Sequence, residues 1–335
     1  MKALTLCAPG KLRLEEQSLP EPAEGEALVR VGAVGICGSD LHWIEEAGIG
    51  DARLTRPLIL GHELAGVIES GDRGGLRVAI DPAISCGRCE HCLEGNPHFC
   101  ENLRFAGHSH QDGGLREVIN WPERFLHPLP ESLSEVDGAM LEPLGVAMHA
   151  LSLAKMKVGM RVGVFGCGPI GLLIVQLARL SGATAIIATD KLPHRLLAAG
   201  EFGATVTIQA HEGEEFPEVW SATGERGVDV AFEAAGENPA VGTAIAAARP
   251  GSRVVLVGIP ADDKTSFTAS TARRKGLTLL LSRRMKNTYP RAVRLVERGL
   301  VDVRSLVTHK FPLDHYQEAF SIARRREGLK VVIEM

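Results

Sequence analysis

Apolar positions follow two different patterns along the chain. Up to about residue 145, short β-prone runs alternate with glycine, proline and polar residues, as in "KALTL", "EALVRVGAVG", "HELAGVIES" and "RVAIDPA". Short strand-like runs bounded by turn formers are typical of all-β architecture. This part of the chain is therefore predicted to form a compact β-rich domain, such as a distorted barrel.

From about residue 160, apolar runs alternate with helical stretches. Six apolar runs are predicted to be strands, at residues 161–166, 184–190, 204–209, 228–236, 252–258 and 277–282. Helical character is strongest at residues 171–182, 193–203 and 238–251. Strands that are apolar almost throughout are buried on both faces, so we expect an α/β doubly wound six-stranded parallel sheet. After about residue 285 the pattern is mixed, and it ends in the strand-like "LKVVIEM".

Length, charge and the N-terminal sequence narrow the class of protein. With 335 residues, of which 45% are apolar, about two domains are expected. The net charge of −4 gives no general attraction to nucleic acid or to an acidic membrane. We find no apolar signal core in "MKALTLCAPGKLRLEE" and no apolar run near the roughly 18 residues that a membrane span needs. We therefore expect a cytoplasmic protein that acts on a small molecule and has neither nucleic acid nor membrane as a partner.

Four of the seven cysteines lie within "SCGRCEHCLEGNPHFC", namely Cys86, Cys89, Cys92 and Cys100. Clustered thiols in the cytosol are more often metal ligands or redox groups than disulfides. Four thiolates at short spacing, with turn formers between them, fit a closed tetrahedral zinc site, and a redox CxxC pair is the alternative. Four protein ligands leave zinc no open position, so we expect this site to be structural and the chemistry to lie elsewhere.

A glycine motif follows the first strand of the second region. In "VGVFGCGPIGLLIVQLARLSGA", Gly166, Gly168 and Gly171 stand between a predicted strand and a predicted helix. Glycines at this spacing let a pyrophosphate approach the backbone at a helix N-terminus. Asp190 closes the next strand, where a carboxylate can accept hydrogen bonds from the adenosine ribose. These residues predict a dinucleotide site.

Asp190 also bears on which dinucleotide is bound. A carboxylate at this position would repel the 2′-phosphate of NADP, which favours NAD. Lys191 and Arg195 follow closely in the sequence and supply positive charge. NAD is therefore the predicted cofactor, with NADP as the alternative.

Oxidation of an alcohol with NAD requires loss of the hydroxyl proton, which a Lewis-acid metal promotes near neutral pH. The β-rich region offers Cys37 in "GICGSDLH" and His62 with Glu63 in "GHELAG", and Glu142 follows in "MLEPLGVAMHA". One sulfur, one nitrogen and a carboxylate with a fourth position open would make a catalytic zinc site. Each residue alone has a simpler explanation in packing or surface contacts. Their occurrence beside a dinucleotide motif predicts the metal site.

These motifs, in this order, resemble the zinc-dependent medium-chain dehydrogenase/reductase superfamily, in its sorbitol (polyol) dehydrogenase-like branch. The similarity extends over essentially the whole chain and includes "NTYPRAVRLV" and "LVTHKFPL" near the end. The resemblance implies a GroES-like β-rich catalytic domain at residues 1–147, completed by residues 286–335. It implies a Rossmann dinucleotide-binding domain at residues 148–285. It further implies a homo-oligomer, either a tetramer or a dimer.

The resemblance also assigns the metal ligands. Cys37 and His62 match ligands of the catalytic zinc, and Glu63 matches the third ligand of the polyol branch. Glu142 matches a carboxylate that contacts zinc or holds its water in different relatives, so either glutamate can complete the site. One structural and one catalytic zinc per chain are implied.

Further roles follow from the same resemblance. Ser39 matches the hydroxyl that takes the proton of the substrate, and His42 matches the histidine that passes it outward. Cofactor contacts are implied for Ile170, Asp190, Arg195, Val257, Gly258 and Ile259, besides the three glycines of the motif.

The chain departs from sorbitol dehydrogenases at two positions near the substrate. Trp43 replaces the usual tyrosine after the relay histidine, and Met285 replaces the tyrosine of an Arg-Tyr pair, of which Arg284 is kept. Loss of hydrogen-bonding groups relaxes or redirects specificity. The predicted reaction is oxidation of a secondary alcohol, chiefly a sorbitol- or xylitol-like polyol, to a ketone. Alternatives are threonine, 2,3-butanediol or sugar-acid oxidation and, in another class, a non-catalytic zinc- and dinucleotide-binding protein.

Overall fold

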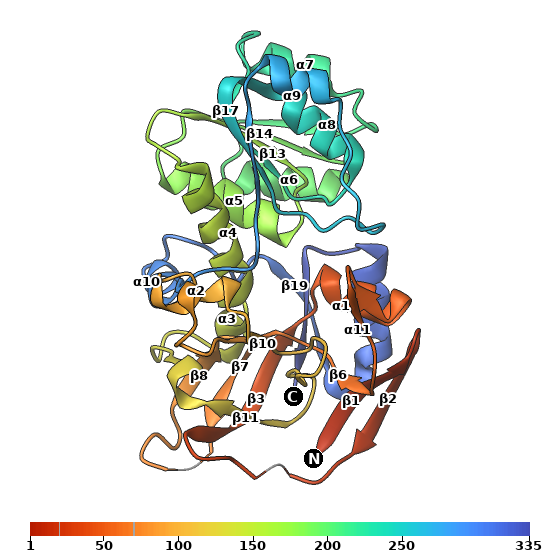
Figure 1. Cartoon of the computed structure of the whole chain (residues 1–335), viewed down its shortest axis with the longest axis vertical. Coiled ribbons are helices and arrows are strands. Elements are labelled where there is room, and N and C mark those ends of the chain that lie inside the picture. Colours follow the sequence, from red (N-terminus) through yellow and green to blue (C-terminus); the bar gives the residue numbers. More distant parts are fainter. Residues whose placement is uncertain (20, 70) are drawn as a thin grey trace. The chain divides into compact units, whose positions relative to one another are not determined.

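The chain folds into two compact units in this computed structural model, which describes residues 1–19, 21–69 and 71–335 (Figure 1). Unit 1 comprises Met1–Gly145 and Lys286–Met335, and unit 2 comprises Val146–Met285. Within the described residues, no helix is both long and apolar enough to cross a membrane.

Unit 1 is built on a seven-stranded sheet in which segments from both ends of the chain take part. Its strand order is β12-β8-β7-β3-β20-β19, with β11 paired to β3. The bounds are β3 (Glu26–Gly35), β7 (Glu63–Ile68), β8 (Arg77–Ile80), β11 (Val118–Pro122), β12 (Leu126–Pro128), β19 (Val307–Pro312) and β20 (Lys330–Glu334). The C-terminal strand β20 pairs antiparallel with β3, so the end of the chain completes a sheet begun near its start.

Smaller elements surround this sheet. A three-stranded sheet has the order β2-β1-β6, and two-stranded ribbons join β4 to β5 and β9 to β10. These strands are β1 (Lys2–Ala8), β2 (Lys11–Glu16), β4 (Gly48–Ile49), β5 (Ala52–Arg53), β6 (Leu58–Ile59), β9 (Ala83–Ile84) and β10 (Arg104–Phe105). The helices are α1 (Gly38–Glu46), α2 (Glu90–Leu93), α3 (Glu135–Ala139), α10 (Tyr289–Glu297) and α11 (Tyr316–Arg325), with short 3-10 turns at Pro97–Phe99, Glu123–Phe125 and Leu313–His315.

The core of unit 1 follows from the alternating apolar pattern of its strands. In β3, Val29, Val31 and Val34 are almost completely buried. They belong to one cluster with Trp43 and Trp121 and with residues of β1, β7 and β20. Burying such side chains stabilises the fold by about 1.5–3 kcal/mol each. The β-rich prediction for this part of the chain is confirmed.

Unit 2 contains the predicted six-stranded parallel sheet, with the order β15-β14-β13-β16-β17-β18. Its strands are β13 (Arg161–Phe165), β14 (Ala185–Asp190), β15 (Val206–Gln209), β16 (Val228–Glu233), β17 (Ala248–Leu256) and β18 (Thr278–Leu281). Its helices are α5 (Pro169–Leu180), α6 (Pro193–Phe202), α7 (Phe216–Ala222), α8 (Asn238–Ala247) and α9 (Ala269–Arg274), and helix α4 (Leu141–Ala154) crosses the boundary with unit 1.

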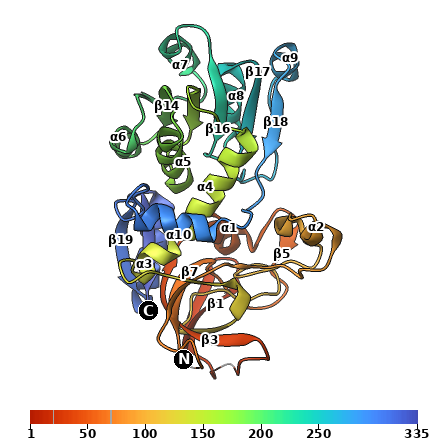
Figure 2. The same cartoon turned by 90° about the vertical axis from the view of Figure 1, so that its left-hand side faces the viewer.

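The strand order explains how the helices of unit 2 cover the sheet. From β13 the chain runs outward to β15 and then returns to β16 on the other side of β13. Because parallel crossovers are right-handed, the reversal puts α5 and α6 on the face opposite to α8 and α9. Figure 2 shows these two pairs of helices flanking the strands. The carboxyl ends of β13, β16 and β17 meet at one edge, where doubly wound sheets bind their ligands.

The predicted element bounds differ from the structure mainly at one place. The helix predicted for residues 238–251 ends at Ala247, and β17 begins at Ala248, four residues before the predicted apolar run. Pro250 explains the early end, because proline cannot donate the helical hydrogen bond and disfavours helix at the residue before it.

Candidate active site

Three predicted metal ligands come together in unit 1. The ligand atoms of Cys37, His62 and Glu63 lie within 4.8 Å of one another. Strand pairing explains this cluster, because Gly35 at the end of β3 is opposite Glu63 at the start of β7. Cys37 follows Gly35 by two residues and caps the N-terminus of α1. His62 and Glu63 are almost completely buried.

Asp40 holds two of these residues in place. One carboxylate oxygen accepts a hydrogen bond from the backbone N–H of Cys37 at 2.9 Å, and the other lies 3.5 Å from Nδ1 of His62. Such a carboxylate beside a ligating histidine fixes the ring orientation and the tautomer. Asp40 lies within "GICGSDLH" but was not among the residues predicted to form the site. The available signal was an acidic residue three positions after an N-cap.

Lys330 was also missed. Its ammonium forms an ion pair with the carboxylate of Glu63, and both side chains are only 2% exposed. The strand pairing of β20 with β3, together with the hydrogen bond from the Ile36 N–H to the Val331 carbonyl, brings this lysine to the metal cluster. No local sequence pattern could reveal the contact, because it depends on a pairing between the two ends of unit 1.

Acidic and basic side chains in this cluster shift one another's pKa values. Burial alone would lower the pKa of His62, but Asp40 and Cys37 raise it well above its usual value. Glu142, on α4, is buried, and burial raises its pKa to about 7, with Glu63 adding to the shift and His62 and Lys330 opposing it. A sulfur, an imidazole and buried carboxylates that favour positive charge fit a zinc ion. Of the two candidate third ligands, Glu63 belongs to this group of ligand atoms and Glu142 does not, although His62 and Glu63 shift the pKa of Glu142.

The residues with predicted roles beside the metal lie on α1. Ser39 and His42 are three positions apart and so share a face of this helix, and both are half-buried. Nδ1 of His42 lies 3.9 Å from a carboxylate oxygen of Glu46. Trp43 is 2% exposed and lies in the core of unit 1, with its ring edge-on to His108 at 5.3 Å. Its role in substrate binding stays a prediction.

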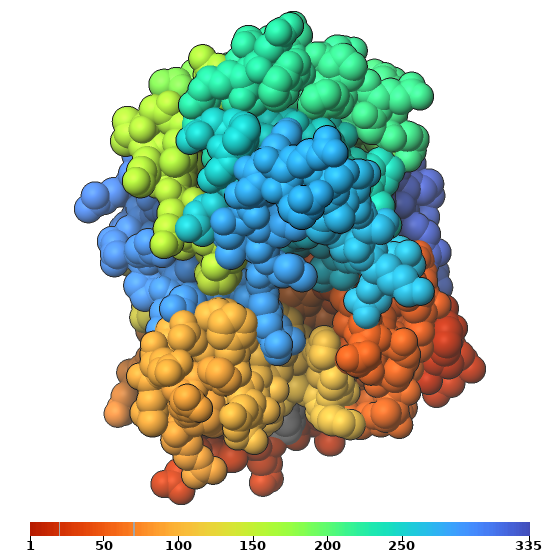
Figure 3. All heavy atoms as spheres, turned by 45° about the horizontal axis from the view of Figure 1, so that its top comes forward, coloured from red at the N-terminus to blue at the C-terminus, as the bar shows by residue number. Residues whose placement is uncertain are grey.

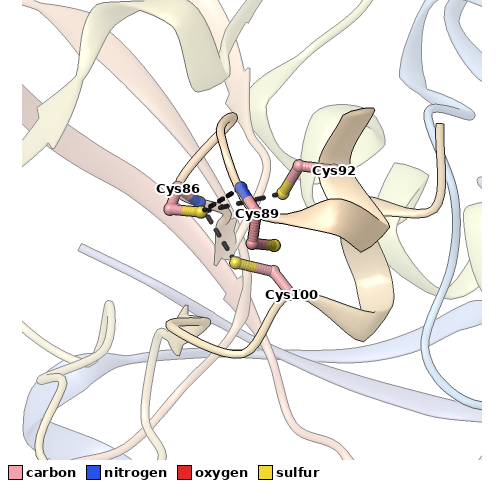
Figure 4. Close-up of side chains that lie close together, drawn as sticks. All are labelled: Cys86, Cys89, Cys92 and Cys100. Carbon is pink, nitrogen blue, oxygen red and sulfur yellow. Dashed lines mark hydrogen bonds between the residues drawn. The ribbon is translucent and has the colours of Figure 1, made fainter. Parts of the chain in front are cut away.

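The four-cysteine segment forms a separate cluster at the surface of unit 1 (Figure 3). The sulfurs of Cys86, Cys89, Cys92 and Cys100 lie within 4.8 Å of one another and point toward a common centre (Figure 4). The Arg88 and Cys89 N–H groups donate to Cys86 at 3.5 and 3.3 Å and lower the pKa of this thiol to about 6. Four inward-facing sulfurs, one of them favoured as a thiolate, fit a structural zinc ion.

The glycine motif of unit 2 forms a tight turn between β13 and α5. Gly166 has φ +101°, and a Cβ there would lie 2.6 Å from the Ala235 nitrogen. A Cβ on Gly171 would lie 1.9 Å from the Gly166 carbonyl oxygen, so only glycine allows α5 to pack this closely. Around Gly168, at the N-cap of α5, the nearest atom to an added Cβ is 3.7 Å away, on Arg195. The turn is open at the point where a pyrophosphate would approach.

Asp190, at the end of β14, is fixed by the same turn. One oxygen accepts from the Cys167 N–H at 2.7 Å and the other from the Leu192 N–H at 2.8 Å. The Arg195 guanidinium lies 4.0 Å from this carboxylate. Lys191 instead pairs with Glu212 and Glu237, and these contacts raise its pKa.

The remaining predicted residues are also in unit 2. Ile170 is half-buried in the first turn of α5. Val257, Gly258 and Ile259 follow β17, and the side chain of Ile259 is 50% exposed. Arg284 and Met285 end the unit; Arg284 has φ +53° and Met285 is 6% exposed. The structure describes their positions and leaves their roles as predictions.

Comparison with known proteins gives consistent matches. Residues 23–131 match the family model "Alcohol dehydrogenase GroES-like domain", and residues 169–298 match "Zinc-binding dehydrogenase". Sorbitol dehydrogenase of Bacillus subtilis (strain 168) is 36% identical over 99% of this chain and 97% of its own length.

Two solved structures from Escherichia coli are similar over their whole length. L-idonate 5-dehydrogenase of strain K-12 superposes with a TM-score of 0.92 at 30% identity, covering 100% of this chain and 98% of that one. A protein described as a short chain alcohol dehydrogenase of strain CFT073, complexed with NADH, gives a TM-score of 0.91 at 30% identity, with 100% and 99% covered. These matches confirm the predicted GroES-like and Rossmann architecture. They also support zinc and a nicotinamide dinucleotide as the cofactors. The chain belongs to the zinc-dependent medium-chain dehydrogenase/reductase superfamily, in its sorbitol dehydrogenase-like branch, and is an oxidoreductase that acts on alcohols.

Proposed function

We propose that this chain oxidises a secondary hydroxyl of a polyol to a ketone with NAD, using a catalytic zinc ion held at Cys37 and His62. The observation that carries the proposal is the buried cluster of Cys37, His62 and Glu63, whose ligand atoms lie within 4.8 Å of one another. Cys37 begins helix α1, which also carries Ser39 and His42. A protein that only bound zinc would not need a hydroxyl and an imidazole on the same face beside its metal.

The residues of the cluster have different proposed roles in zinc binding and proton transfer. A zinc ion bound here supplies Lewis acidity, which makes a substrate hydroxyl easier to deprotonate. Asp40 keeps the His62 ring oriented, and Glu63 or Glu142 completes the ligand set. Ser39 accepts the substrate proton and His42 passes it outward toward solvent, where Glu46 lies close to its ring. Burial of the cluster excludes water and strengthens these interactions.

We further propose NAD as the cofactor. Asp190 is 8% exposed and occupies the position that would meet the adenosine ribose. Lys191 cannot easily serve a 2′-phosphate because two glutamates already neutralise it. Arg195 lies within 4.0 Å of Asp190, so its charge is partly balanced as well.

A polyol is the substrate that the relatives favour. The relative with 36% identity over nearly the whole chain is a sorbitol dehydrogenase. Trp43 and Met285 lack the phenolic hydroxyls usual in that branch, so specificity among sorbitol- and xylitol-like polyols is expected to be relaxed or redirected. A sugar acid is the second candidate, because L-idonate 5-dehydrogenase has a similar structure and Arg284 could bind a carboxylate bidentately.

Three finer points belong to the same proposal. The catalytic domain spans residues 1–147 and 286–335, and the Rossmann domain spans residues 148–285. Each chain holds two zinc ions, one at Cys37 and His62 and one at the four-cysteine cluster. The protein works as a homo-oligomer, a tetramer or a dimer.

The test combines a substrate panel with a matched pair of variants. NAD and NADP reduction at alkaline pH would be followed with hexitols, pentitols, butanediol, threonine and sugar acids, with and without a chelator. Cys37→Ser should abolish turnover and lower bound zinc from two ions to one while NADH still binds. Cys7→Ser is the control, because Cys7 is another half-buried thiol but lies on β1. Normal turnover by the Cys37→Ser variant would refute the proposed metal site.

A further inference from the structure

Glu233 is a buried carboxylate to which neither the motif nor the proposed chemistry gives a role. It is the last residue of β16 and is 1% exposed. Its Oε1 atom accepts hydrogen bonds from the backbone N–H groups of Ala235 at 2.8 Å and Gly236 at 2.6 Å. A carboxylate that accepts several backbone N–H bonds holds a turn rigidly, because these bonds are short and charge-assisted. Glu233 thus shapes the turn at residues 234–236.

The same residue contacts the next turn along the sheet edge. Its backbone carbonyl accepts from the N–H groups of Val257 at 2.8 Å and Gly258 at 3.2 Å. A Cβ added to Gly258 would lie 2.1 Å from the Gly236 nitrogen and 2.9 Å from Oε2 of Glu233. Two glycines therefore let the turns touch directly, with the Glu233 carboxylate beneath them.

The first glycine turn lies on the other side of the 234–236 turn. The Ala234 N–H donates to the Phe165 carbonyl at 2.8 Å, and a Cβ on Gly166 would lie 2.6 Å from the Ala235 nitrogen. Three turns are therefore packed in a row at the carboxyl ends of β13, β16 and β17. Glu233 anchors the central turn by its side chain and the outer turn by its backbone carbonyl.

We propose that Glu233 is a positioning residue that sets the place of the Val257–Gly258–Ile259 turn and thereby controls binding of the nicotinamide half of the cofactor. The inference rests on the proposed function, which puts the nicotinamide beside that turn. Glu233 acts through the turns, because its own side chain is buried beneath them. Asp190 and Gly168 would hold the adenosine and pyrophosphate half, whereas the Glu233 carboxylate accepts its hydrogen bonds from Ala235 and Gly236.

Because the two halves of the dinucleotide site involve different residues, the affinities for two ligands can test the role of Glu233. NADH needs both halves of the site, whereas ADP-ribose carries the adenosine, pyrophosphate and ribose but lacks nicotinamide. Glu233→Met keeps most of the length of the side chain but removes both carboxylate oxygens, so the Ala235 and Gly236 N–H groups lose their charged acceptor. The affinity for NADH should fall about tenfold or more, the usual effect of losing a hydrogen bond to a charged group, and that for ADP-ribose should change less than about threefold.

Asp229 provides a matched control on the same strand. It lies at the opposite end of β16, where its carboxylate accepts from the Arg161 N–H at 2.9 Å and pairs with Arg226 and Arg249. Asp229→Asn removes a similar set of bonds far from the three turns. It should lower the unfolding temperature and leave the ratio of NADH to ADP-ribose affinity unchanged, as would any purely structural loss.

The experiment measures NADH binding by fluorescence and ADP-ribose binding by calorimetry on the full chain with its zinc. Selective loss of NADH in the Glu233→Met protein supports the inference, and equal loss of both ligands, or no loss, overturns it. If that variant does not fold, Gly258→Ala tests the same contact from the other turn and must show the same selectivity. Failure of the unaltered protein to bind either ligand would overturn the proposed function and this inference with it.

Discussion

Replacing Lys330 by methionine tests the least expected feature of the metal cluster. Methionine keeps most of the length of the side chain and removes its charge. Glu63 would then lose its cation, while β20 keeps its register with β3 because that pairing uses backbone groups. The change therefore isolates the ion pair from the sheet that carries it.

The size of the effect follows from burial. Both side chains of the pair are 2% exposed, so removing Lys330 leaves a carboxylate buried without compensation. Breaking a buried pair in this way costs about 3–5 kcal/mol, a large part of the roughly 5–15 kcal/mol that stabilises a typical protein. Lys310→Met is the matched control, because Lys310 pairs with Glu334 between the neighbouring strands β19 and β20 at 3.7 Å, with about half of each side chain exposed. Exposed pairs contribute at most about 1 kcal/mol.

The assay is urea unfolding of metal-free protein, followed by tryptophan fluorescence. Trp43 and Trp121 are buried in unit 1 and report on its unfolding, while Trp220 reports on unit 2. Glu63→Gln and the double variant complete a cycle, in which the double variant should lose less than the sum of the single losses. A loss of under about 1 kcal/mol for Lys330→Met, or strict additivity in the cycle, would refute the reasoning.

Three further predictions concern other parts of the chain. Cys100→Ser should lower the unfolding temperature by roughly 5–10 °C through loss of the structural zinc, and a value equal to that of Cys7→Ser would contradict the site. Burial lowers the pKa of His127 from 6.5 to about 4, so the unfolded chain binds the proton first as the pH falls, and stability is lost between these values. His127→Phe keeps an aromatic ring stacked on Tyr289 and should reduce this acid-dependent loss of stability by up to about 3 kcal/mol. Acid unfolding curves measure the effect, and an unchanged dependence of stability on pH would show that His127 does not cause the loss. Asp190→Ser should raise kcat/KM for NADP relative to NAD, and a constant ratio would remove Asp190 as the discriminating residue.

The parts of the structure that local patterns determine could be predicted from the sequence. "EALVRVGAVG" was predicted to be a strand and forms β3 at Glu26–Gly35, where the buried Val29 and Val31 alternate with the less buried Arg30 and Gly32. The glycine motif and Asp190 were found because their spacing reflects one strand–turn–helix unit. In the same way Cys37, His62 and Glu63 could be proposed together from neighbouring motifs and the resemblance.

Residues that act across the fold could not be found in this way. Lys330 meets Glu63 only because β20 is inserted beside β3, and a lysine in "LKVVIEM" has no local feature that sets it apart. Glu233 was included in a predicted strand, but its contacts with Gly236 and Gly258 depend on the packing of two separate turns. For both Lys330 and Glu233, the sequence offers only one indication of a role. Each is a charged residue within an apolar strand, and such a residue needs a partner if it is buried.

The charges around Cys37 explain why a lysine and a metal can share one buried site. Asp40, Glu63 and Glu142 are almost completely buried there. Without a metal, the Lys330 ammonium balances Glu63, and despite burial Asp40 raises the pKa of His62 well above its usual value, which favours a proton on the ring. Burial also raises the pKa of Glu142 to about 7, which favours its protonated form. A divalent cation would replace these protons and supply positive charge in their place. The Lys330–Glu63 ion pair balances only one of the buried carboxylates, so the site still favours binding of a divalent cation.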